Sequence, residues 1–112
     1  MLAGTPPGTG EKRANPRWPV RFPVLHGYGG KMLVGLAADL NDYGMAFVTR
    51  IPYAVDSILA LELRLPSGRI RVKGIVRHCR TGMAGVQFLE LSQQQRRELQ
   101  DYCLGQAPRV PN

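Results

Sequence analysis

The sequence predicts an all-β fold, a six-stranded antiparallel β-barrel followed by a C-terminal α-helix. From residue 20 to residue 89, apolar side chains recur mainly at every second position, the period of strands with one buried face. Turn-forming residues separate these runs. After Ser92 the apolar spacing changes to three and four residues, the period of an amphipathic helix. We expect the sheet to close on itself, because closure removes exposed strand edges.

Three apolar runs predict the first half of the barrel, at residues 20–24, 31–38 and 44–50. In the first run Val20, Phe22 and Val24 occupy alternate positions and therefore share one face. The other two runs are strongly apolar and are separated from their neighbours by segments rich in glycine, aspartate and asparagine. Each run is therefore interpreted as a strand that ends in a turn.

The stretch from residue 58 to residue 76 predicts a hairpin. Its first strand has leucine at every second position, followed by the turn sequence Pro66-Ser67-Gly68. The returning strand again alternates apolar with charged residues, so the hairpin has one dry and one wet side. The predicted inward residues are Leu59, Leu61, Leu63, Leu65, Ile70, Val72 and Val76. A sixth short strand is expected at residues 83–89, after the turn Thr81-Gly82.

The final element is predicted to be a helix that plugs one end of the barrel or lies on its outside. Ser92 and Gln95 have the spacing of a capping box, in which each side chain bonds the backbone N–H of the other residue. Gly105 and Pro108 mark its end. The apolar stripe consists of Leu99, Tyr102 and Cys103.

Composition indicates one small folded domain. The chain has 112 residues, is 44% hydrophobic and carries a formal charge of +7, so disorder throughout is excluded. We expect a flexible Gly/Pro/Thr-rich tail or linker at residues 1–11, a domain at 12–104 and a disordered tail at 105–112. No apolar run approaches the ~20 residues of a membrane span. Without a secretory signal, and with two cysteines expected to be free thiols, the sequence predicts a cytoplasmic protein with no direct membrane insertion.

Catalytic chemistry is not predicted. Metal-ligand spacings such as Cys-x-x-Cys are absent from the sequence, and His26 and His78 stand alone. The serines lie in turn or capping contexts, without the surroundings of an activated nucleophile. We therefore expect no enzyme activity, no catalytic residue, no metal and no cofactor.

Binding of an anionic ligand is predicted near the first strand. Arg13 and Arg17 flank Pro16, which prevents a regular helix and stiffens the bend. Two guanidinium groups on such a bend suit planar bidentate acceptors, such as phosphates or the O6/N7 edge of guanine. Lys12 adds charge, and Trp18 offers a stacking or packing surface.

A second group of polar residues lies between the second and third predicted strands. Asp39 could accept hydrogen bonds from N1–H and N2–H of a guanine, and Asn41 could donate or accept. Gly44 is expected to supply the positive φ of a tight turn. The same residues are also those of an ordinary turn between strands.

Taken in order, Arg13-x-x-x-Arg17 and Asp39-x-Asn41-x-x-Gly44 resemble the two motifs of the PilZ domain family. The resemblance extends over nearly all of residues 11–104. It implies that cyclic di-GMP, a bacterial second messenger, is bound by these five residues, with Lys12 and Trp18 in secondary roles. Asn41 stands where the family usually has serine. The resemblance implies that the residue just before the first motif arginine is linked to whether one nucleotide or a stacked pair binds. Lys12 occupies this position here and leaves the number of bound nucleotides open.

The implied mechanism is a switch. The N-terminal segment would fold over the bound nucleotide, and the signal would pass to an effector protein or a neighbouring domain. One alternative is a PilZ-like adaptor that binds a protein partner without nucleotide. A second is a basic barrel for single-stranded nucleic acid, although the stretch from Arg64 to Arg80, which carries six cations, contains no Phe, Trp or Tyr.

Overall fold

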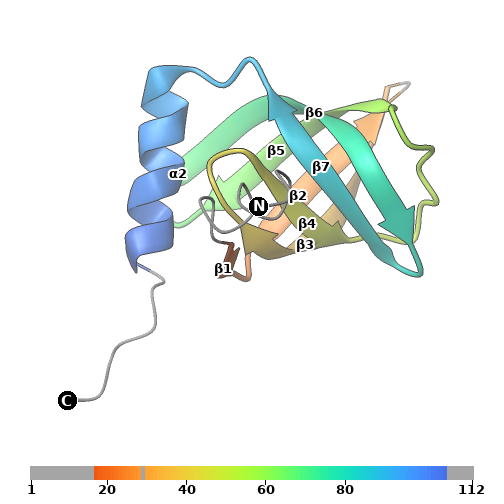
Figure 1. The fold of residues 1–112 in the computed structure, drawn as a ribbon, viewed down its shortest axis with the longest axis horizontal. Coiled ribbons are helices and arrows are strands. Elements are labelled where there is room, and N and C mark those ends of the chain that lie inside the picture. The colour runs from red at the N-terminus through yellow and green to blue at the C-terminus, as the bar shows by residue number, and fades with distance from the viewer. Residues whose placement is uncertain (1–16, 29, 106–112) are drawn as a thin grey trace, which may run out of the picture.

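A computed structural model describes residues 17–28 and 30–105 of the chain (Figure 1). The predicted tails at residues 1–11 and 105–112 lie outside this part, except for Gly105, which ends the helix. The elements are β1 (Trp18–Pro19), β2 (Pro23–Tyr28), β3 (Lys31–Leu40), β4 (Gly44–Val48), β5 (Ile58–Leu65), β6 (Gly68–Arg80), β7 (Met83–Leu89) and α2 (Gln93–Gly105).

The predicted fold class is confirmed. The strands are antiparallel and follow the order β1-β3-β2-β5-β6-β7-β4, and an additional β3–β4 pairing closes β2 to β7 into a six-stranded barrel. The two-residue strand β1 is an addition to the six expected strands and pairs with the end of β3.

The first strand is displaced from its predicted position at residues 20–24, because β2 begins only at Pro23. Two single hydrogen bonds hold the preceding stretch to β3, from Val20 N to Ala38 O and from Ala37 N to Phe22 O. Proline lacks an N–H and interrupts a ladder. Residues 20–22 of the predicted strand therefore connect β1 to β2, and Pro23 begins β2.

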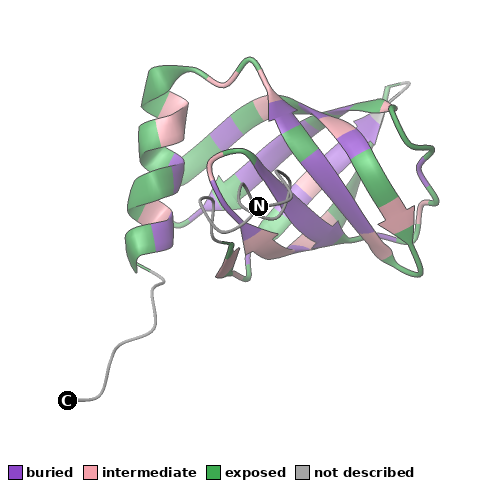
Figure 2. Cartoon of the chain, in the orientation of Figure 1, coloured by how far each residue is buried: buried purple, intermediate pink, exposed green. Residues whose placement is uncertain are grey.

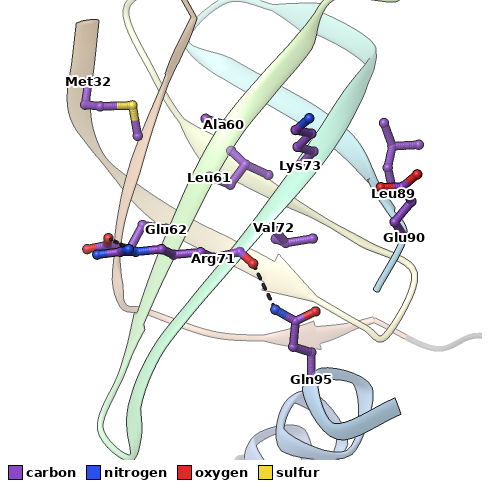
Figure 3. Close-up of a pocket in the computed structure, with 10 residues that line it drawn as sticks. All are labelled: Met32, Ala60, Leu61, Glu62, Arg71, Val72, Lys73, Leu89, Glu90 and Gln95. Atoms are coloured by element: carbon purple, nitrogen blue, oxygen red, sulfur yellow. Dashed lines mark hydrogen bonds and ion pairs between the residues drawn. The ribbon is translucent and has the colours of Figure 1, made fainter. Parts of the chain in front are cut away.

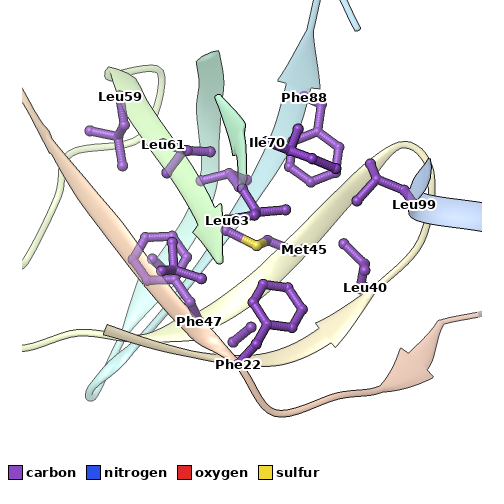
Figure 4. Close-up of a cluster of buried hydrophobic side chains, with 14 of the residues drawn as sticks. Phe22, Leu40, Met45, Phe47, Leu59, Leu61, Leu63, Ile70, Phe88 and Leu99 are labelled. Atoms are coloured by element: carbon purple, nitrogen blue, oxygen red, sulfur yellow. The ribbon is translucent and has the colours of Figure 1, made fainter. Parts of the chain in front are cut away.

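The barrel interior is filled by the predicted inward residues. Figure 4 shows leucines of β5 facing Met45, Phe47 and Phe22 across the interior. Leu59, Leu61 and Leu63 are at most 2% exposed. Truncating a leucine buried in this way costs roughly 2–5 kcal/mol of folding free energy, so this core contributes much of the stability.

Helix α2 covers one end of the barrel (Figure 1). Its Leu99 and Cys103 belong to the buried core, and Tyr102 packs edge-on against Phe22 with ring centroids 5.5 Å apart. Figure 2 shows buried and half-buried residues on its barrel side. The predicted capping box is present, with Gln95 N donating to Ser92 Oγ and Ser92 N donating to Gln95 Oε1, both at 3.0 Å.

Both cysteines are free thiols. Cys103 lies on the buried face of α2, and this burial raises the pKa of its thiol to about 11. Because the thiolate is the reactive species, Cys103 acts as a small apolar core residue at neutral pH.

Strand β3 extends past the end of β4. Its pairing with β4 begins only at Leu36, so no described strand pairs with the β4-facing edge of its first half. Two side chains of this half, Met32 and Val34, are 45% and 74% exposed. The barrel is therefore closed more completely near α2 than at the opposite end.

His26 is a buried polar residue of the barrel interior, only 1% exposed. Its Nδ1 lies 2.7 Å from the hydroxyl oxygen of Tyr53, and its ring packs 4.7 Å from that of Phe47. Burial disfavours the charged imidazolium and lowers the pKa of His26 below its usual 6.5.

This lowered pKa predicts a loss of stability in acid. Below pH 6.5 the unfolded chain takes up a proton at His26 more readily than the folded one. The stabilising contribution of the neutral His26 ring to the unfolding free energy is therefore complete above pH 6.5 and decreases as the pH falls below it. Urea titrations measure the unfolding free energy at each pH. When the pH is lowered from 7.5 to 5.5, this free energy should decrease less for His26→Gln than for wild type. Equal decreases in the two proteins would contradict this assignment.

Candidate functional site

A β-bulge in β3 places Asp39 on the outside of the barrel. The pairing with β4 shifts between Ala37 and Asp39, so Ala38 is an extra residue. Ala37 and Leu40 are therefore both buried, while the Asp39 side chain between them is 33% exposed. Bulges redirect side chains in this way beside binding sites.

Strand β1 brings Arg17 to Asp39. Trp18 pairs with Leu40 and Pro19 with Asp39, which brings the preceding residue within reach of the Asp39 side chain. Arg17 Nη1 donates to Asp39 Oδ1 at 2.7 Å, and the Arg17 side chain is 50% exposed. The same Oδ1 accepts from the backbone N of Ala46 at 3.2 Å. Two residues of different predicted motifs, 22 positions apart, are thus in direct contact.

The loop between β3 and β4 is organised by Asn41. Its Oδ1 accepts hydrogen bonds from the backbone N of Tyr43 and of Gly44, at 2.8 and 3.0 Å. Its own backbone N donates to the carbonyl oxygen of Gly44 at 3.0 Å. Asn41 is only 7% exposed. The side chain thus closes the turn from within, and its contact with a ligand stays a prediction.

Gly44 is required for a reason other than the one predicted. Its φ is not in the positive range expected for a tight turn, so that explanation is wrong. A Cβ at this position would lie close to the carbonyl oxygen of Val86, because β4 and β7 approach closely here. The glycine therefore permits close approach of two strands at the start of β4.

Substitutions of Asn41 should separate turn closure from ligand contact. Asn41→Ala removes the acceptor of two backbone N–H groups, one buried and one partly buried, so we expect a loss of roughly 1–3 kcal/mol of unfolding free energy, measured by denaturant titration. Asn41→Ser supplies a hydroxyl that accepts similar local bonds. It should retain most of this stability, and any ligand affinity should stay at wild-type level or increase. Equal losses in both variants would contradict the role of the acceptor.

A row of outward residues continues from Asp39 across three further strands. Asp39 pairs with Ala46, Ala46 with Gly85, and Gly85 with His78. The His78 ring covers Gly85 so closely that no Cβ would fit there. The two residues in the middle of this row, Ala46 and Gly85, are small and buried. In the sequence His78 stands alone and gives no sign of belonging to a site. Its place in this row depends on a second bulge, at Arg77 in β6, which the sequence pattern does not reveal.

The other predicted residues are placed unequally. Trp18 is half-buried and packs against the core, which favours the packing role over stacking. Lys12 and Arg13 lie outside the described residues. The structure therefore brings together Arg17, Asp39 and the turn from Asn41 to Gly44, and leaves the first half of the arginine motif to experiment.

A hollow of about 520 Å³ on the outer wall of β5 and β6 lies apart from these residues (Figure 3). Its wall includes Glu62, which accepts from Arg64 Nε at 2.9 Å and from Arg71 Nε at 3.1 Å. These arginines, Arg64 first, lower the pKa of Glu62. Two of the six cations from Arg64 to Arg80 are thus paired with an acidic side chain within the sheet. Among the described residues, no group of three His, Cys, Asp or Glu is arranged to hold a metal ion.

The family model of the PilZ domain matches residues 11–105. The chain belongs to the PilZ family. The match includes both arginines of the first motif and the whole of the second. The barrel, the additional strand and the terminal helix agree with this assignment.

Several solved structures are similar in fold. The PilZ domain of YcgR from Escherichia coli with c-di-GMP has a TM-score of 0.74 at 14% identity, over 85% of this chain and 91% of that chain. The inhibitor of motility MotI/DgrA from Bacillus subtilis has a TM-score of 0.75 at 18% identity, over 84% and 50%. The K. pneumonia MrkH–c-di-GMP complex has a TM-score of 0.67 at 18% identity, over 83% and 51%.

This PilZ chain therefore spans about half the length of MotI and MrkH. The search of curated proteins gives no match. Within residues 17–28 and 30–105, no helix has the length and apolar character needed to cross a membrane.

Proposed function

We propose that this PilZ domain is a receptor for cyclic di-GMP and not an enzyme. The observation that carries the proposal is the contact between Arg17 and Asp39, one residue from each predicted motif, at 2.7 Å on an accessible surface. PilZ membership and the nucleotide-bound relatives YcgR and MrkH support it.

In the proposed complex, Asp39 and Arg17 divide the recognition of guanine and phosphate. Asp39 Oδ2 would accept from the N1–H and N2–H groups of a guanine, and Oδ1 stays bound to the backbone N of Ala46. Arg17 would turn its free donors to the O6/N7 edge or to a phosphate. Asn41 and Gly44 would hold the turn on which this surface depends.

The N-terminal segment would complete the site. Arg13, with Lys12, would approach the nucleotide from the side of Arg17, so that the ligand links this segment to the barrel. Trp18, which packs against the core, would anchor the end of the segment. Binding would then act as a switch read by an effector protein or a neighbouring domain in the cytoplasm. In this proposal cyclic di-GMP is a regulatory ligand that dissociates chemically unchanged.

Calorimetric titration of the full chain with cyclic di-GMP tests this function, with GTP and a short single-stranded oligonucleotide as controls. We expect selective binding of cyclic di-GMP with a micromolar or lower Kd, and a stoichiometry that shows whether one or two nucleotides occupy the site. Absence of heat from folded protein would exclude the receptor function and favour a protein-binding adaptor. Equal or tighter binding of the oligonucleotide would also overturn it.

A further inference from the structure

Helix α2 contacts the turn that carries the proposed ligand residues. Arg96 Nη1 donates to the backbone carbonyl oxygen of Asp42 at 2.9 Å and lies 3.8 Å from its Oδ2. Gln100, four residues later on the same helix face, donates from Nε2 to Asp42 Oδ2 at 3.0 Å. Both the backbone and the side chain of Asp42 are therefore bound by the helix.

Two further contacts connect the helix to residues beside Asp42. The Arg96 guanidinium lies 5.5 Å from the centroid of the Tyr43 ring, a cation–π distance. The Cys103 Sγ lies 3.8 Å from the carbonyl oxygen of Leu40. The helix thus contacts the chain immediately before and within the turn from Asn41 to Gly44.

The position of Asp42 within the turn gives these contacts a consequence for binding. Asp42 directly follows Asn41, whose Oδ1 bonds the N–H groups of the next two residues, Tyr43 and Gly44. A shift of the Asp42 carbonyl would therefore disturb the same short hydrogen-bonded loop. Binding sites generally tolerate displacements of only about 0.5 Å in their contact groups.

We propose that Arg96 is a positioning residue for nucleotide binding, which fixes the turn from Asn41 to Gly44 through Asp42. This inference rests on the proposed function. Docking of α2 and occupation of the nucleotide site are then coupled equilibria, so each favours the other to the same extent. Arg96 acts in this proposal through its contacts with Asp42 in the turn.

The test compares two neighbouring arginines of α2. Arg97 is exposed and has no hydrogen bond or ion pair with any residue in the described ranges, yet its removal changes the net charge by the same amount. In calorimetry with cyclic di-GMP, Arg96→Ala should raise the Kd about tenfold, within the usual range of such couplings. Arg97→Ala should stay within about twofold of wild type. Arg96→Lys keeps one donor for the Asp42 carbonyl and should recover part of the loss.

Amide hydrogen exchange of the unliganded protein gives a readout that does not depend on nucleotide. Exchange at Tyr43 and Gly44 should be faster in Arg96→Ala and unchanged in Arg97→Ala. Equal affinities of the two alanine variants, or equal exchange at these amides, would overturn the positioning role. If wild type binds no nucleotide, the proposed function fails, while faster exchange in Arg96→Ala alone would still establish that the helix positions the turn.

Discussion

Replacing Arg17 with alanine is expected to weaken cyclic di-GMP binding about 100-fold or more, while the melting temperature stays within a few degrees. Hydrogen bonds to charged groups contribute roughly 1.5–3 kcal/mol each, and the proposed clamp loses two of them. The ion pair with Asp39 is accessible to solvent and therefore adds no more than about 1 kcal/mol to folding. Calorimetry and thermal unfolding of the same preparation measure both quantities.

Two further variants separate the shape of the Arg17 side chain from its charge. Arg17→Lys keeps the charge but lacks the planar pair of donors, so its affinity should lie between those of wild type and Arg17→Ala. Arg50→Ala removes one exposed cation away from the site and should leave the Kd nearly unchanged. Wild-type affinity in Arg17→Ala would show that the residue is not part of the clamp.

Gly44→Ala should produce the largest loss of stability among the substitutions considered. The added Cβ would meet the backbone carbonyl of Val86, and neither strand can yield without breaking β4–β7 hydrogen bonds. Overpacking of this kind costs roughly 3 kcal/mol, which lowers the melting temperature of a domain of this size by roughly 10–15 °C. Thermal unfolding followed by circular dichroism measures this change.

Gly105→Ala is the matched control for this substitution. A Cβ at Gly105, the last residue of α2, meets no atom within 4 Å, and its φ is not positive. The same chemical change should therefore alter the melting temperature by no more than a few degrees. A Gly44→Ala protein as stable as Gly105→Ala would mean that β4 and β7 separate easily at this point, contrary to the close approach inferred here.

The strand pattern could be predicted because the barrel buries one face of each strand. The alternate leucines of β5 point inward as expected, since any other register would expose all of them. The capping box of α2 could be predicted equally well, because it consists of two local hydrogen bonds, in which the side chains of Ser92 and Gln95 each accept from the other's backbone N–H. Local chemistry and one-sided burial determine these features.

The geometry of the site depends on features that no local pattern reveals. The bulges at Ala38 and Arg77 arise from the pairing between strands, and they turn Asp39 and His78 to the same outer face. The close approach at Gly44 likewise depends on β7, about forty positions later in the chain. The motif residues could therefore be named from the sequence, whereas their common surface required the pairing of four strands.

The unpaired half of β3 has a consequence for the behaviour of concentrated protein. Met32 and Val34 are exposed there beside backbone groups that no described strand pairs with. An apolar strand edge of this kind is a template for intermolecular β-pairing. Self-association would therefore begin at the end of the barrel away from α2. It would leave the surface around Asp39 uncovered. Substitutions at Met32 or Val34 could then reduce aggregation without changing nucleotide binding.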